Sequence, residues 1–224
     1  PYLKLYHQEE VMHVLVLVDA SASMMFENKL LRAQELAAAF SALILHGAER
    51  LSVYVFNGAP ESPRKLPPCS GRGNMPHAFR FIESIVGGGR APVEDGIVEA
   101  LQRHVGRGVA VVLSDFLTFG DLQGTFNRLF STGLEPFAVQ IMSPTELDPE
   151  LGGDLRMLDS ETGEHLDVSS VGSLMDIYHD CLDDLRHELR SLCRSRCGRF
   201  MRVSSDDALD WVLFDRMRRE GWLA

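Results

Sequence analysis

The segment MHVLVLVD, residues 12–19, is apolar from Val14 to Val18 and ends on Asp19. A strand that faces solvent on one side alternates apolar with polar residues, whereas a strand covered on both faces is apolar throughout. Doubly covered strands occur mainly in parallel sheets, because the crossover helices lie on both faces. This segment therefore predicts an α/β fold with a buried central strand.

The next part of the chain alternates strand and helix patterns, which predicts a doubly wound, Rossmann-like and mostly parallel sheet with helices on both faces. The Pro-rich segment 62–68 fits only a short edge strand. The predicted strands are residues 51–57, 108–116 and 134–142, and the predicted helices are residues 29–47, 77–86, 93–105 and 121–130.

The pattern changes after Ser143, although no linker separates a second domain. Residues 154–168 read as two short strands around a turn, and residues 174–192 as a long amphipathic helix. Residues 198–205 and 207–220 predict a final strand and helix. We therefore expect one domain over residues 1–224, with a hairpin and a terminal strand–helix extension from about residue 144.

The net charge is −10, and the isoelectric point is about 5.2. Nucleic-acid binding depends on phosphate contacts from basic groups, so this balance argues against such a partner and against a polybasic membrane anchor. No apolar segment is long enough to cross a bilayer, and the chain starts at Pro1 without the pattern of a signal peptide. We expect a soluble cytoplasmic protein without membrane insertion by this chain.

Candidate metal ligands follow the two strongest predicted strands. Asp19 ends the first strand, Ser21 and Ser23 follow it at alternate positions, and Asp115 ends the strand at residues 108–116. In an open parallel sheet, ligands bind beyond the carboxyl ends of the strands, where these side chains would meet if the strands are neighbours. Carboxylates and hydroxyls suit a hard cation such as Mg²⁺ or Mn²⁺.

The segment DASASM resembles the Asp-x-Ser-x-Ser signature of von Willebrand factor A domains. The wider chain resembles the bacterial domain-of-unknown-function 58 family over YLKLYHQEE, DASASM, LSDF, DPE and LDSETGEH. Members carry an upstream stretch that this sequence lacks, so the chain is similar to their carboxyl-terminal part. The resemblance implies a metal-ion-dependent adhesion site with Asp19, Ser21 and Ser23 at the signature positions and Asp115 at the later aspartate.

One position departs from the pattern that the resemblance implies. Those domains place a threonine in a Gly-rich loop, and in GGGRAPVEDG that place falls on Ala91. Alanine has no donor atom for a metal ion. Water, Glu94 or Asp95 could fill the gap, and so the occupancy of the site by magnesium stays open.

The residues favour a non-enzymatic protein-interaction module whose cation captures an acidic side chain of a partner. The resemblance implies association with a MoxR-type AAA ATPase in an assembly or chaperone system. Two alternatives stay open: a metal-dependent hydrolase or phosphotransferase at the same edge of the sheet, and a degenerate interaction domain without metal. Catalysis is disfavoured because no G-x-S-x-G elbow is present and no histidine stands out as a base.

Other chemistry-bearing residues have simpler interpretations. Cys193 and Cys197 lack a second pair at zinc-ligand spacing, which favours free thiols. His13, inside the first strand, is expected to be a packed or edge-lying imidazole. Trp211, Phe214 and Trp222 are expected to pack the last helix against the core.

Overall fold

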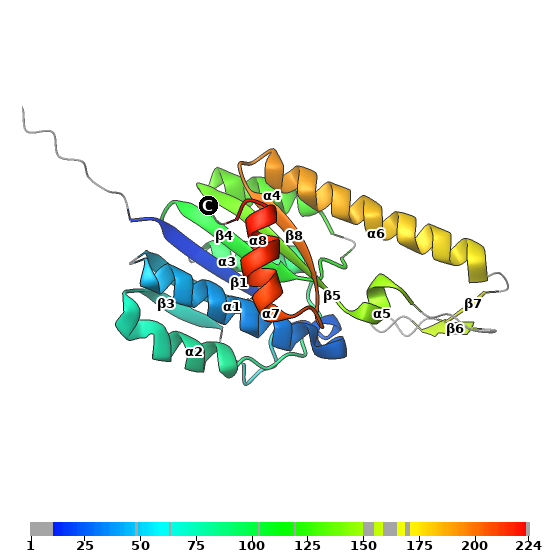
Figure 1. Cartoon of the computed structure of the whole chain (residues 1–224), viewed down its shortest axis with the longest axis horizontal. Helices are drawn as coiled ribbons and strands as arrows, with labels where there is room; N and C mark the ends of the chain where they lie inside the picture. The colour runs from blue at the N-terminus through cyan, green and yellow to red at the C-terminus, as the bar shows by residue number, and fades with distance from the viewer. Residues whose placement is uncertain are drawn as a thin grey trace, which may run out of the picture.

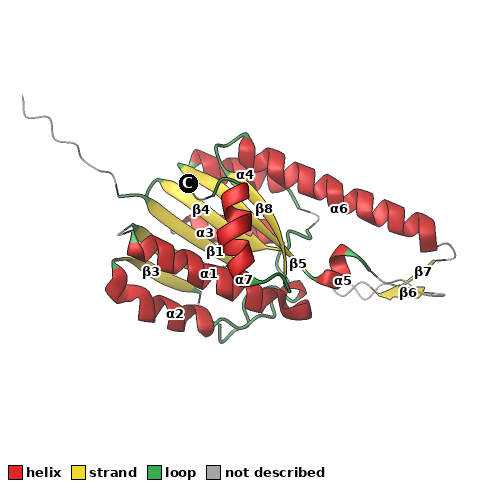
Figure 2. Cartoon of the chain, viewed as in Figure 1, coloured by secondary structure: helices red, strands yellow, loops and turns green. Residues whose placement is uncertain are grey.

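The computed structural model describes residues 11–222 apart from residues 48, 63, 103, 119, 150–154, 159–164 and 169–170. The main sheet has six strands in the order β3-β2-β1-β4-β5-β8 (Figures 1 and 2). Its strands are β1 (His13–Asp19), β2 (Arg50–Phe56), β3 (Lys65–Ser70), β4 (Gly108–Ser114), β5 (Leu134–Met142) and β8 (Arg199–Ser204). Segment 2–10 and turn 159–164, which carry part of the family resemblance, lie outside the described residues.

The first strand is central, as its apolar run predicts. All seven residues of β1 are buried. The strand pairs in parallel with β2 on one side and β4 on the other, with Asp19 opposite Phe56 and Val18 opposite Leu113. Every pairing in the sheet is parallel except that of the edge strand β3. The expected doubly wound, mostly parallel sheet is confirmed.

Helices cover both faces of this sheet (Figure 2). One face of the sheet packs with α1, α2 and the last helical segment through Val14, Val16 and Val18. The other face packs with α3, α4 and α6 through Leu15 and Leu17. The helices are α1 (Lys29–His46), α2 (Met75–Glu83), α3 (Val93–Gln102), α4 (Leu122–Ser131), α5 (Pro144–Leu147), α6 (Val171–Arg194), α7 (Leu209–Trp211) and α8 (Met217–Arg219). Three further helical segments are the 3-10 segments η1 (Ser23–Asn28) and η2 (Arg72–Asn74) and the π-helical segment η3 (Val212–Arg216).

The carboxyl-terminal strand belongs to the main sheet. β8 lies parallel to β5, with Phe137 opposite Arg199, so the expected terminal strand extends the main sheet. The predicted hairpin is present as β6 (Leu155–Leu158) and β7 (His165–Val168), which pair antiparallel. In the described residues no helix is both long and apolar enough to cross a membrane.

Only one of the three terminal aromatic residues packs against the core as expected. Trp222 packs against Phe40 and Phe137, with ring centroids 5.8 and 5.0 Å apart. Phe214 is 73% exposed and Trp211 is 37% exposed, so their predicted burial is wrong. The helix buries Val212 and Met217 instead, and the π-helical turn between them shifts the face that meets the sheet.

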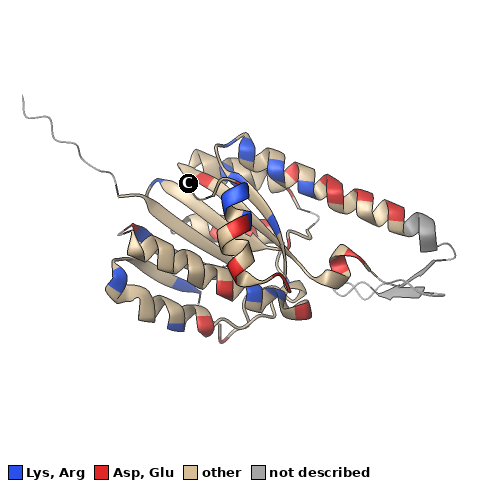
Figure 3. Cartoon of the chain, in the orientation of Figure 1, with Lys and Arg blue, Asp and Glu red and all other residues tan. Residues whose placement is uncertain are grey.

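Helix α6 runs past the edge of the sheet (Figure 1). Its carboxyl-terminal part buries Leu189 and Cys193 against the sheet, whereas Ile177 in the overhanging part is 60% exposed. Acidic residues lie along its exposed face (Figure 3). The described thiols, including Cys193 and Cys197, are free.

We predict that Gly96→Ala destabilises the protein. A Cβ atom at Gly96 would lie 2.6 Å from Cβ and 2.5 Å from Cγ of Phe56, so the methyl group would push α3 away from β2. Overpacking of this kind costs about 1–3 kcal/mol, more than the gain in helix propensity of about 1 kcal/mol. Urea unfolding measures the difference.

Gly73→Ala is the matched control, because a Cβ atom at Gly73 meets nothing within 4 Å. We expect its unfolding free energy to stay within about 0.5 kcal/mol of the wild-type value. Equal stability of both variants would contradict close packing between α3 and β2.

Candidate functional site

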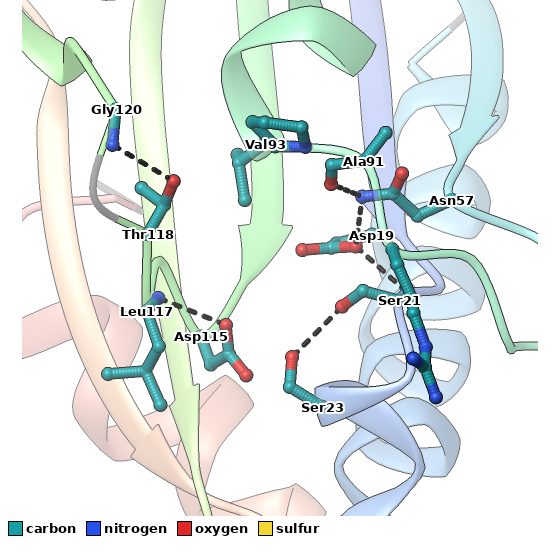
Figure 4. A pocket seen from close by; sticks show the side chains of 12 residues that line it. Asp19, Ser21, Ser23, Asn57, Ala91, Val93, Asp115, Leu117, Thr118 and Gly120 are labelled. Carbon is teal, nitrogen blue, oxygen red and sulfur yellow. Dashed lines mark hydrogen bonds between the residues drawn. The ribbon is translucent and has the colours of Figure 1, made fainter. Parts of the chain in front are cut away.

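A cavity of about 320 Å³ lies at the carboxyl ends of the parallel strands, and we name it the apex cavity (Figure 4). Asp19 from the end of β1 and Asp115 from the end of β4 both line it. The structure therefore brings together the two carboxylates that the sequence predicts at one edge of the sheet. The other lining residues are Ser21, Ser23, Asn57, Arg90, Ala91, Pro92, Val93, Leu117, Thr118 and Gly120.

Asp19 is completely buried and is held by neighbouring donors. Its Oδ2 accepts a 2.7 Å hydrogen bond from the Ser114 hydroxyl, and its Oδ1 accepts a 2.9 Å bond from the Ser21 amide. The Asn57 amide donates a longer bond of 3.4 Å to Oδ1. Burial, together with the nearby charge of Asp115, raises the pKa of Asp19 to about 6. Near neutral pH a bound proton, or another cation beside it, therefore stabilises this buried carboxylate.

The two predicted hydroxyls face each other. Ser21 Oγ and Ser23 Oγ are 3.0 Å apart, and both side chains line the apex cavity (Figure 4). The segment leaves β1 and enters η1, which fixes the hydroxyls beside the Asp19 carboxylate. The structure thus places together all four predicted ligands: Asp19, Ser21, Ser23 and Asp115.

A buried lysine that the sequence reading missed engages one of these carboxylates. Lys29 Nζ lies 2.9 Å from Asp115 Oδ2 and 2.5 Å from Glu146 Oε1, and its side chain is 0% exposed. The other oxygen of Asp115 accepts a 3.1 Å bond from the Leu117 amide. Lys29 is the first residue of α1, so its position after the Asp-x-Ser-x-Ser segment was the available signal in the sequence.

The Gly-rich loop packs against the ends of two strands. Gly88 N donates to Ala20 O at 2.9 Å, and Gly89 N donates to Asn57 O at 2.7 Å. A Cβ atom at Gly89 would lie 2.5 Å from the Asn57 carbonyl oxygen, so a larger residue would displace the loop. Ala91 follows this contact, and its carbonyl accepts a 2.8 Å bond from the Asn57 side chain.

Neither acidic residue considered as a substitute for the missing threonine lines the apex cavity. Glu94 accepts a 3.1 Å bond from Thr118 Oγ1, and Asp95 lines a different cavity. Thr118 itself lines the apex cavity and offers the additional hydroxyl there. The sequence reading missed Thr118 because it comes from the loop after β4, outside the segment where the resemblance places the threonine.

Three exposed apolar side chains belong to the segments that form this polar cavity, and Leu117 among them lines it. Met25 and Phe26 in η1 are 55% and 46% exposed, and Leu117 is 40% exposed. Met25 and Phe26 lie two and three residues after Ser23, and Leu117 lies two residues after Asp115. We name these three residues the apolar rim. A polar centre with apolar surroundings is typical of a binding surface.

The family model described as "Protein of unknown function DUF58" matches residues 1–180. The chain belongs to the DUF58 family. No curated protein is similar enough in sequence to match this DUF58 chain.

Solved structures similar to this DUF58 chain share its fold at low sequence identity. The conserved hypothetical protein BatB from Bacteroides thetaiotaomicron is 14% identical, with a TM-score of 0.55, and the match covers 95% of this chain and 100% of that one. An aerotolerance-related membrane protein from Bacteroides fragilis is 19% identical, with a TM-score of 0.57, and the match covers 93% and 98%. The pilus adhesin SpaC from Lactobacillus rhamnosus GG is 12% identical, with a TM-score of 0.57, and the match covers 95% and 30%.

The side-chain atoms that line the apex cavity of this DUF58 chain determine which metal ions it could bind. Among the described residues, no three His, Cys, Asp or Glu side chains cluster as metal ligands. A cation would therefore need hydroxyl oxygens from Ser21 and Ser23 beside the Asp19 carboxylate, whose Oδ2 accepts only one hydrogen bond and keeps a lone pair. Oxygen donors of this kind fit Mg²⁺ or Mn²⁺ with several retained waters.

We predict that Lys29→Met destabilises the protein by about 3–5 kcal/mol, because it leaves the buried Asp115 carboxylate without its cation. Asp115→Asn in the Lys29→Met background should restore part of the loss, since the unpaired charge is then gone. Urea unfolding of both single variants and the double variant gives the coupling energy. Additive losses would contradict a direct interaction between the two side chains.

We predict that Asp19→Asn stabilises the protein at neutral pH when a chelator is present. The folded pKa of about 6 exceeds the ordinary value of 3.8, so the folded state binds a proton that the unfolded chain has lost. Wild-type stability therefore falls as the pH rises through this window. The variant should be more stable by up to about 3 kcal/mol at pH 7.5, with little difference below pH 4.

Thermal unfolding at several pH values measures this difference. Asp210→Asn, which removes an exposed carboxylate at α7, is the control and should follow the wild-type curve. A stability difference between Asp19→Asn and wild type that stays constant with pH would contradict the raised pKa.

Proposed function

We propose that this chain is a non-enzymatic protein-interaction module that binds a partner's acidic side chain at the apex cavity. The convergence of Asp19, Ser21, Ser23 and Asp115 on one cavity is the observation that carries the proposal. The apolar rim supports it, because exposed apolar side chains beside a polar anchor are common in protein interfaces.

In this proposal Mg²⁺ or Mn²⁺ bridges the chain and the partner, as in the metal-ion-dependent adhesion site of von Willebrand factor A domains. Asp19, Ser21 and Ser23 would hold the ion, and Asp115 would act through a water molecule. The raised pKa of Asp19 supports a cation there, because a cation would offset both the burial of the carboxylate and the repulsion from Asp115. A site with few direct negative charges leaves the ion able to attract a partner's carboxylate.

A second candidate is an interaction domain that works without a metal ion. Lys29 favours this candidate, since its ammonium group already neutralises Asp115. Ala91 favours it too, because that position supplies no ligand atom. In this version the apolar rim and the hydroxyl groups of the cavity would make the contact with the partner.

We rank a metal-dependent hydrolase or phosphotransferase behind both candidates. General acid–base chemistry needs a titratable group within hydrogen-bond reach of the substrate. No histidine is among the residues that line the apex cavity in the described part of the chain. The base would have to be Asp19, which is also the proposed ligand, or Asp115, whose carboxylate is already paired with Lys29.

We propose a MoxR-type AAA ATPase as the partner and the cytoplasm as the location. The resemblance to the domain-of-unknown-function 58 family supports this partner, and the acidic composition, with a net charge of −10, supports a binding role without nucleic acid.

Calorimetry with MgCl₂ and MnCl₂ separates the two candidates. If the ion-bridge version is right, the wild-type chain binds a divalent cation, and Asp19→Ala abolishes the binding. Ala91→Thr should bind it more tightly, because the hydroxyl adds a ligand. Metal uptake by Ala91→Thr alone would assign the natural chain to the metal-free version, and uptake by neither would reject the ion bridge.

A binding assay with the purified MoxR-type ATPase from the same genome tests the interaction surface. Phe26→Asp should weaken binding at least about tenfold, because it places a charge in the apolar rim. Phe130→Asp on α4 is the matched control, since Phe130 is 48% exposed and Phe26 is 46% exposed. Equal binding by both variants would show that the apex does not contact the ATPase. A chelator should weaken binding only in the ion-bridge version.

A further inference from the structure

A second cavity lies near the opposite end of the sheet, and we name it the basal cavity. It has a volume of about 260 Å³ and lies between β1, β2, β3 and the carboxyl-terminal end of α3. His13 and Arg50 open two neighbouring parallel strands, where they pair with each other in register. The basal cavity is thus separate from the apex cavity, which lies where these strands end.

The lining of the basal cavity is basic in an acidic protein. Its charged or ionisable nitrogen groups come from Arg50, Lys65, His13 and His104, and no carboxylate is among its lining residues in the described part of the chain. The whole chain has a net charge of −10. A cavity that gathers positive groups against this background attracts anions.

The two imidazoles are ordered and close together. The rings of His13 and His104 have centroids 4.6 Å apart. His13 Nδ1 lies 3.2 Å from the Val105 carbonyl oxygen, and His13 Nε2 lies 2.9 Å from Ser52 Oγ. A carbonyl oxygen only accepts, so Nδ1 carries the proton, and the Ser52 hydroxyl donates to Nε2 of the neutral ring.

Protonation of His13 would reverse this last bond. Nε2 would then donate to Ser52 Oγ, and the hydroxyl hydrogen of Ser52 would become available to a ligand. Burial and the positive charges of His104, Arg50 and Lys65 lower the pKa of His13. Burial and Lys65 also lower the pKa of His104. A bound anion would oppose these effects and favour protonation of both rings.

We propose that the basal cavity binds a small oxyanion of the phosphate type between Arg50, Lys65 and the paired imidazoles of His13 and His104. An arginine guanidinium matches the geometry of phosphate oxygens, and the lysine ammonium adds a point charge. The volume suits a phosphate group with a small organic body and is too small for a large cofactor. This site is independent of the function proposed for the apex cavity.

The proposal gives binding a defined pH dependence. The positive groups that face the imidazoles are Arg50 from β2 and Lys65 from β3, and Tyr54 also lines the cavity. The nearby helix α3 carries Glu99, which forms an ion pair of 4.0 Å with Arg64 and is not among the residues that line the cavity. Binding should therefore tighten as the pH falls toward 6, because protonation adds positive charge from His13 and His104.

Calorimetric titration with sodium sulfate at about pH 6 and about pH 7.5 tests the site, because sulfate stays a dianion at both values. Sodium chloride at equal ionic strength is the control for screening. We expect saturable sulfate binding that is tighter at the lower pH, and competition by inorganic phosphate. Arg50→Gln should weaken binding about tenfold to a hundredfold through loss of charged hydrogen bonds.

Arg80→Gln removes an equal charge from the exposed face of α2, so it should bind sulfate like the wild type. His104→Asn should reduce the pH dependence, and Asp19→Asn at the apex should leave sulfate binding unchanged. No saturable binding, equal weakening by Arg50→Gln and Arg80→Gln, or an affinity independent of pH would overturn the proposal.

Discussion

Lys29 lies buried between the carboxylates of Asp115 and Glu146, at 2.9 and 2.5 Å. This ion pair joins the end of β4, the start of α1 and the short helix α5. Two carboxylates, Asp19 and Asp115, are fully or almost fully buried at the apex, and a buried charge is tolerated only with a partner. Lys29 supplies that partner for Asp115, whereas Asp19 has only neutral donors, and burial together with the charge of Asp115 raises the pKa of Asp19 to about 6.

The parallel sheet gives the protein two chemically different ends. Carboxylates and hydroxyls meet where β1 and β4 end, because both strands run in the same direction. Basic groups gather near where β1 and β2 begin, and there they line the basal cavity. The apex would attract a cation or a hydrogen-bonding partner, whereas the base would attract an oxyanion. The proposed functions of the two ends follow from this separation of charge.

The sequence predicted the elements of the sheet well, because long apolar runs and helical periodicity are local signals. It also predicted that Asp19 and Asp115 would meet if their strands were neighbours, and the pairing of β1 with β4 meets that condition. The sequence shows Lys29 shortly after the Asp-x-Ser-x-Ser segment, but its burial against Asp115 could not be predicted, because a lysine at a helix start is normally exposed. Phe214 was misplaced because a π-helical turn changes which face of the last helix meets the sheet.

The sequence by itself determined the α/β architecture, the central strand β1 and the residue types at the end of each strand. Only the tertiary structure decided which side chains pair across elements distant in the sequence, such as Lys29 with Asp115 and His13 with Ser52. The physical reason is that periodicity depends on neighbouring residues and therefore survives in the sequence. Burial and the pairing of charges depend on how the helices pack, which no local pattern records.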